Sequence, residues 1–135
     1  DNTDQAERLS EIFEAILDLI DTFDIPFVLP LHPRTAKLLE VNLSKDLYQK
    51  VTTEKKLKII PPVSFLDMIA LEKNSKIIVT DSGGVQKEAF FFKKPCIILR
   101  PETEWVELVS CGAAQIVGWH KDKIKNAFCS FSFYI

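Results

Sequence analysis

The stretch from residue 77 to residue 92 constrains the fold of this chain more than any other. An apolar, strand-like run at 77–79 stops at the small polar sequence T-D-S-G-G, and a helix-type pattern follows from residue 85. The amides that open a helix have no intrahelical acceptor, and the helix dipole gives them partial positive charge. Because glycines let a ligand approach such amides closely, the stretch predicts a phosphate site. In the alternative interpretation, Asp81 or Ser82 only caps the helix and the glycines only turn the chain.

Strand-like and helix-like segments alternate along the rest of the chain. Apolar residues at helical spacing predict helices at 3–23, 35–39, 65–71, 106–109 and 121–128, while residues 43–53 are expected to form a loop or a short helix. Short apolar runs predict strands at 27–31, 57–60, 76–79, 95–99 and 113–117. This alternation is typical of an α/β fold, a three-layer Rossmann-like parallel sheet with right-handed crossovers. We expect one domain at 1–128, and the pattern assigns no structure to the tail at 129–135.

Composition excludes several classes of protein. The 135 residues are 47% hydrophobic and 27% charged, which is the balance of a globular domain rather than a disordered chain. The net charge of −2 offers no basic footprint for nucleic acid, and no apolar run approaches the roughly 18–20 residues of a membrane span. Three cysteines without C-x-x-C spacing indicate reduced thiols rather than a disulfide framework or a zinc site. We therefore expect a cytoplasmic protein with neither nucleic acid nor a membrane as a partner.

Polar clusters follow four of the expected strands, at the point where each strand ends. They lie at 32–34, 61–68, 81–84 and 100–104. Ligands of open parallel sheets bind at the carboxyl ends of the strands, so we expect all four clusters to line one rim. His32 and Arg34 would attract a diphosphate there, or would be a surface histidine and an arginine paired with some carboxylate. Arg100, with Glu102 and Glu104 after it, would contact a sugar or form a solvated loop.

Two further features of this rim suit a nucleotide. The segment 62–68 combines backbone amides with apolar side chains, Phe65 and Met68 among them, that would hold a flat base. The alternative is ordinary helix core, which Phe65 taken alone favours. Glu88, about one turn into the helix after T-D-S-G-G, would reach a ribose diol. No nucleophile–base pair, readable carboxylate pair or metal-binding cluster accompanies these residues. The inventory indicates a binder of phosphate and nucleotide more than a catalyst.

Four motifs together resemble those of a known family. L-P-L-H-P-R-T at 29–35, T-D-S-G-G-V-Q-K-E-A at 80–89, K-K-P-C-I-I-L-R-P-E-T-E-W at 93–105 and G-A-A-Q-I-V-G at 112–118 resemble, in order and spacing, the non-hydrolysing UDP-N-acetylglucosamine 2-epimerases. The resemblance extends over residues 2–125. It implies a glycosyltransferase-B (GT-B) architecture, in which two Rossmann-like domains hold a UDP-sugar between them. This chain is similar to the C-terminal half alone.

The same resemblance implies a reaction and a set of site residues. UDP would leave by anti elimination to give a 2-acetamidoglucal and would then add back with C2 inverted. Separately, we expect neither a cofactor nor a metal. His32 would be the catalytic residue, stabilising UDP as it departs. The diphosphate would be held by Ser82, Gly83 and Gly84, and the ribose hydroxyls by Glu88. The uracil would be carried by Pro62, Phe65 and Met68. The loop would be supported by Arg34 and Gln86, and Arg100 would complete the UDP-binding set.

The resemblance also implies what this chain lacks. In that family the carboxylates that move the C2 proton lie mainly in the N-terminal half, so we expect the chain alone to be inactive. We also expect the parent protein to be a homodimer. The run at 100–105 departs mildly from the family's pattern, and the tail beyond Lys125 does not match its closing helix. The alternatives are a GT-B-type glycosyltransferase, a hydrolysing UDP-GlcNAc 2-epimerase, or a non-enzymatic nucleotide-binding module.

Overall fold

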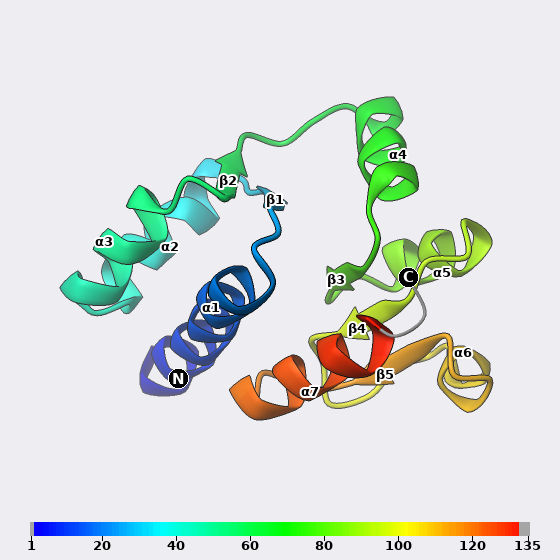
Figure 1. Ribbon diagram of the computed structural model, residues 1–135. Helices are drawn as coiled ribbons and strands as arrows, with labels where there is room; N and C mark the ends of the chain where they lie inside the picture. Colours follow the sequence, from blue (N-terminus) through cyan, green and yellow to red (C-terminus); the bar gives the residue numbers. More distant parts are fainter. Residues whose placement is uncertain (1, 133–135) are drawn as a thin grey trace. The chain divides into compact units, whose positions relative to one another are not determined.

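The computed structural model describes residues 2–132, which form seven helices and five strands (Figure 1). In chain order these are α1 (Asn2–Phe23), β1 (Phe27–Pro30), α2 (Pro33–Asn42), α3 (Lys45–Thr53), β2 (Leu57–Ile60), α4 (Phe65–Asn74), β3 (Ile78–Thr80), α5 (Gly83–Phe91), β4 (Cys96–Ile98), α6 (Val106–Ser110), β5 (Ala114–Ile116) and α7 (Lys121–Ser132). They divide into two compact units, Asp1–Val63 and Ser64–Ile135. The predicted alternation of helices and strands is confirmed.

The first unit is built around the apolar stripe of α1. Phe13, Ile16 and Ile20 recur at three- and four-residue spacing and are buried, so one face of α1 enters a core that α2, α3 and β2 complete. β1 and β2 pair in parallel, with Phe27 opposite Leu57. The expected helix at 3–23 and the expected strand at 57–60 are therefore confirmed.

Two helices of this unit are longer or better formed than the sequence predicted. α2 begins at Pro33, because proline suits the first helical position, and it runs on to Asn42. α3 occupies the region expected to be a loop or a short helix. The hydroxyl of Ser44 caps it by accepting a hydrogen bond from the Leu47 amide at 3.1 Å, and Leu47 is buried on its inner face.

The second unit is a three-stranded parallel sheet in the order β3-β4-β5. The central strand is buried throughout, since Cys96, Ile97 and Ile98 are each no more than 2% exposed. Cys96 and Ile98 lie in a core with residues of α5 and α6, and α7 also packs against β4. The uninterrupted apolar run of β4 is thus explained by helices that cover the sheet.

The last helix extends past the predicted end. α7 runs to Ser132, so residues 129–132 of the unassigned tail are helical, while residues 133–135 lie outside the described part. Ile124, Phe128 and Phe131 repeat at helical spacing and are buried, which supplies the reason for the extension.

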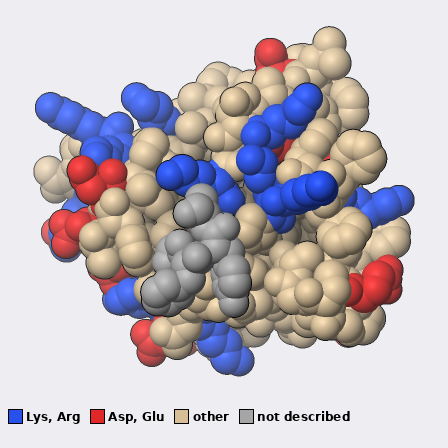
Figure 2. Space-filling view, turned by 45° about the vertical axis from the view of Figure 1, so that its right-hand side comes forward, with Lys and Arg blue, Asp and Glu red and all other residues tan. Residues whose placement is uncertain are grey.

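The surface carries charges of both signs. Figure 2 shows Lys and Arg side chains on the same face as Asp and Glu, with uncharged residues among them. Within residues 2–132, every helix is too short or too polar to cross a membrane.

Candidate functional site

The candidate site begins at the N-terminus of α5. Ser82 is the N-cap residue, and its Oγ accepts a hydrogen bond from the Val85 amide at 3.4 Å. The Ser82 amide in turn donates to Thr80 Oγ1 at 3.0 Å. Within the part of the chain that the structure describes, the amides of Gly83 and Gly84 have no acceptor. The cap of the alternative interpretation is present, and so are the two unused amides that a phosphate site requires.

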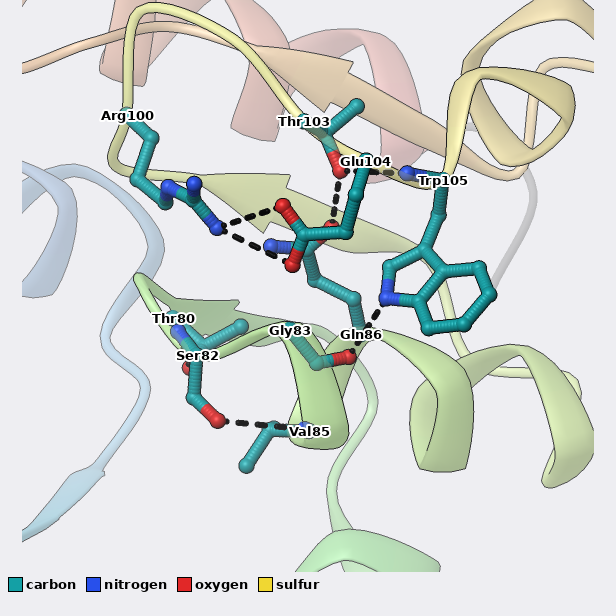
Figure 3. A network of polar contacts seen from close by, with 9 residues as sticks. All are labelled: Thr80, Ser82, Gly83, Val85, Gln86, Arg100, Thr103, Glu104 and Trp105. Atoms are coloured by element: carbon teal, nitrogen blue, oxygen red, sulfur yellow. Dashed lines mark hydrogen bonds and ion pairs between the residues drawn. The ribbon is translucent and has the colours of Figure 1, made fainter.

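The loop after β4 covers the start of α5 (Figure 3). Trp105 Nε1 donates to the carbonyl oxygen of Gly83 at 3.0 Å, and Thr103 Oγ1 donates to Gln86 Oε1 at 2.6 Å. Because β3 and β4 are parallel neighbours, the segments that follow them meet at one edge of the sheet. Two of the four predicted polar clusters are therefore brought together.

The side chain of Glu104 closely approaches Gly83. A Cβ at this position would overlap Glu104 Oε1 and lie 3.4 Å from Trp105 Nε1, whereas a Cβ on Gly84 would meet Ser82 Oγ at an ordinary 3.8 Å. The Glu104 carboxylate thus lies against the positive end of α5, where the helix dipole favours an anion. Sequence reasoning left the role of this residue open.

Arg100 and Gln86 are both bound to other protein groups. Arg100 Nη1 lies 3.1 Å from Glu104 Oε2, so the guanidinium forms an ion pair at the edge of the site. Gln86 is fully buried, and its Nε2 has no acceptor among the described residues. These positions suit a supporting role for Gln86, and direct contact of Arg100 with a substrate stays a prediction.

Glu88 lies half-buried on α5, and the structure places a second carboxyl beside it. This is Glu72 of α4, only 4% exposed. Burial first, and then the adjacent Glu88 carboxyl, raise the pKa of Glu72 to about 7. Sequence reasoning missed Glu72, because its burial and its carboxyl neighbour on α5 arise only in the folded chain.

Three of the predicted residues, His32, Arg34 and Pro62, belong to the first unit. His32 caps α2 in the first unit, and its Nδ1 accepts a hydrogen bond from the Arg34 amide at 3.1 Å. With Nδ1 used as this acceptor, Nε2 is the ring nitrogen left to face a ligand. Pro62 follows β2 and is exposed. That the clusters of the two units line a common rim stays a prediction.

The side chains of segment 62–68, which is predicted to hold the base, differ in their exposure to solvent. Phe65, at the first turn of α4, is 69% exposed, so its interpretation as helix core is wrong. Met68 is half-buried. Ser64 caps this helix by accepting a hydrogen bond from the Asp67 amide at 3.2 Å.

Comparison with known proteins agrees with this geometry. The family model of UDP-N-acetylglucosamine 2-epimerase matches residues 1–132, and the chain belongs to this family. The UDP-N-acetylglucosamine 2-epimerase of Methanocaldococcus jannaschii is 45% identical over 94% of the chain. The UDP-2,3-diacetamido-2,3-dideoxy-D-glucuronate 2-epimerase of Pseudomonas aeruginosa is 48% identical over 92% of the chain.

Solved structures confirm the fold class. The M. jannaschii enzyme in complex with UDP-GlcNAc and UDP superposes with a TM-score of 0.86 at 44% identity, covering 96% of this chain and 35% of that one. The Neisseria meningitidis enzyme bound to UDP-GlcNAc gives a TM-score of 0.77 at 32% identity and covers 93% of this chain. The predicted family and the α/β, Rossmann-like fold of GT-B-type epimerases are confirmed. The chain spans about a third of the length of the relatives it matches.

Proposed function

We propose that this chain is the UDP-binding, C-terminal part of a UDP-GlcNAc 2-epimerase. The observation that carries the proposal is the pair of unused amides, Gly83 and Gly84, at the positive end of α5. They lie within the T-D-S-G-G sequence of a chain that matches the family over residues 1–132. A relative that is 44% identical was solved with UDP-GlcNAc and UDP, which supports a nucleotide-sugar as the ligand.

Each predicted residue has a role in this proposal. The diphosphate accepts hydrogen bonds from Gly83, Gly84 and the Ser82 hydroxyl, and His32 Nε2 donates to the oxygen that leaves C1 of the sugar. Charge grows on the diphosphate as it departs, so preorganised donors stabilise the transition state, by about 3 kcal/mol for a typical donor. Glu88 accepts from the ribose hydroxyls.

The remaining predicted residues are assigned to the uracil, to the charge of the diphosphate and to loop support. Pro62, Phe65 and Met68 contact the base, while Arg34 and Arg100 contribute positive charge near the diphosphate, and Gln86 supports the loop after β4. The high exposure of Phe65 leaves its ring available for such a contact.

The chemistry at C2 needs groups outside this set. We assign proton abstraction and return to carboxylates of an N-terminal domain, and we place the complete enzyme in the cytoplasm as a homodimer. Residues 1–128 would then act as one UDP-binding domain.

A second substrate is favoured by one relative. The P. aeruginosa protein, 48% identical, is a 2-epimerase of UDP-2,3-diacetamido-2,3-dideoxy-D-glucuronate. Both sugars share UDP and an epimerised C2, so the α5 site would serve either. Affinities for the two UDP-sugars, measured side by side, distinguish them.

Calorimetry with UDP tests the proposal. Ser82→Tyr fills the approach to the Gly83 and Gly84 amides, and we expect it to weaken UDP binding by at least about tenfold. Ser44→Tyr is the matched control, because Ser44 caps α3 in the same way and lies outside the proposed site. UDP binding by Ser82→Tyr equal to that of the unaltered chain would contradict the proposal.

A further inference from the structure

Glu72 is buried without a donor to stabilise its charge. Its side chain is 4% exposed, and within the described part of the chain no hydrogen-bond donor reaches either carboxyl oxygen. An ionised carboxylate in such a place carries a large desolvation penalty. The surroundings of Glu72 therefore favour its protonated form.

The group beside Glu72 is a second carboxyl, Glu88 of α5. Two ionised carboxylates repel each other, but a single proton between them gives a short, charge-assisted O–H···O⁻ hydrogen bond. The proton belongs on the more buried member, Glu72, since Glu88 is only half-buried. The neighbouring lysines are directed elsewhere: Lys73 Nζ lies 5.7 Å from the ring centroid of Phe92, and Lys87 Nζ lies 4.9 Å from that of Trp105.

We propose that Glu72 is a positioning residue whose protonated carboxyl donates to Glu88 and holds that carboxylate in place to accept the ribose hydroxyls of a UDP-sugar. This inference deepens the proposed function and rests on it. The remaining lone pairs of Glu88 stay available to the ligand, while Glu72 fixes its rotamer from the protein side. When Glu72 ionises, repulsion turns Glu88 away, so affinity for the UDP-sugar falls as the pH rises through neutrality.

A carboxyl titration tests the pair without any ligand. Side-chain ¹³C NMR of the chain is expected to show one glutamate that titrates near pH 7, in agreement with the pKa of about 7 that burial and Glu88 give Glu72. That titration should disappear in Glu72→Gln and remain in Glu40→Gln, which alters an exposed glutamate of α2. If every glutamate titrates below about pH 5.5, the pair does not share a proton and the inference is overturned.

Binding of UDP-GlcNAc tests the positioning role. We expect the affinity of the unaltered chain to be about tenfold weaker at pH 8 than at pH 6. Glu72→Gln retains a donor toward Glu88 and should bind with the pH 6 affinity at both values, whereas Glu72→Leu should bind weakly at both. An identical pH dependence in Glu72→Gln and the unaltered chain would overturn the role. Absence of binding at either pH would contradict the proposed function, and the carboxyl titration would then decide the pair by itself.

Discussion

Gly83 and Gly84 are adjacent in sequence and have different physical roles. The loop after β4 approaches Gly83 so closely that a side chain there would overlap Glu104 Oε1, while a Cβ on Gly84 makes only an ordinary contact with Ser82 Oγ. Both offer a backbone amide to the proposed ligand. Only Gly83 also provides the space in which the Arg100–Glu104 ion pair lies.

Alanine substitutions separate these two roles. Gly→Ala at the start of a helix favours folding through chain entropy by up to about 1 kcal/mol, and this contribution is common to both positions. Gly83→Ala must also displace the paired Glu104 carboxylate, so we expect it to be about 1 kcal/mol less stable than Gly84→Ala. Urea unfolding of the two variants provides the measurement. Equal stability would show that Glu104 moves aside without penalty.

The raised pKa of Glu72 makes a prediction about stability and pH. Its pKa rises from 4.5 to about 7 on folding, so between these values the folded chain holds a proton that the unfolded chain has released. The contribution of Glu72 to stability is complete below about pH 4.5 and is lost as the pH rises through 7, by about 3 kcal/mol at most at 1.4 kcal/mol per pKa unit. Unfolding free energies at pH 5 and pH 8 should differ less in Glu72→Gln than in the unaltered chain. The same difference in both proteins would contradict this account.

Individual site residues were predictable where a local rule governed them. The sequence T-D-S-G-G predicted a capped helix start, and Ser82 does cap α5. The roles of Glu72 and Glu104 were not predicted, because each depends on a tertiary contact that no local pattern encodes. Glu72 of α4 lies beside Glu88 of α5, and Glu104 of the loop after β4 lies against Gly83 of α5. The hydrogen bond from the Arg34 amide to His32 Nδ1 likewise decides which ring nitrogen is left for a ligand, and sequence alone does not show it.

Helices and strands follow the sequence pattern most closely where periodicity is long. The stripe of α1 and the apolar run of β4 were both predicted, because burial on one face or on both leaves a direct mark on the sequence. The ends of elements were less predictable. α7 continues to Ser132 because Phe131 packs into the core, whereas the local sequence carries no helix stop or start signal there.

Phe131 therefore contributes to stability although it lies beyond the predicted helix. Its ring is 4% exposed, and truncation of a buried aromatic ring costs about 3–5 kcal/mol, so we expect Phe131→Ala to lower the free energy of unfolding by about 3 kcal/mol. Phe91→Ala is the control, since Phe91 is 79% exposed and its loss should cost less than about 1 kcal/mol. Comparable losses in the two variants, measured by thermal unfolding, would show that residues 129–132 do not pack as described.

The chain as a whole matches its family over residues 1–132 but spans about a third of its relatives' length. Family and fold class were predictable because four motifs stand in order across both units. The proton transfer at C2, which is assigned to groups outside this chain, was predictable only from the resemblance to the family.

Catalysis is expected to need more than this chain. Incubated with UDP-GlcNAc and followed by proton NMR, the purified chain should produce no UDP-ManNAc, because the groups that exchange the C2 proton are assigned to the N-terminal domain. Turnover by the chain alone would overturn that assignment. Inactivity of the chain should be accompanied by retained UDP binding.

The amide resonances of Gly83 and Gly84 give the most direct measurement of the central claim, that the opening amides of α5 bind a diphosphate. In a ¹⁵N-labelled chain titrated with UDP, both resonances should shift saturably, whereas uridine, which has the base and ribose but no phosphate, should leave them in place. UDP binding that leaves both amides unmoved would contradict the account.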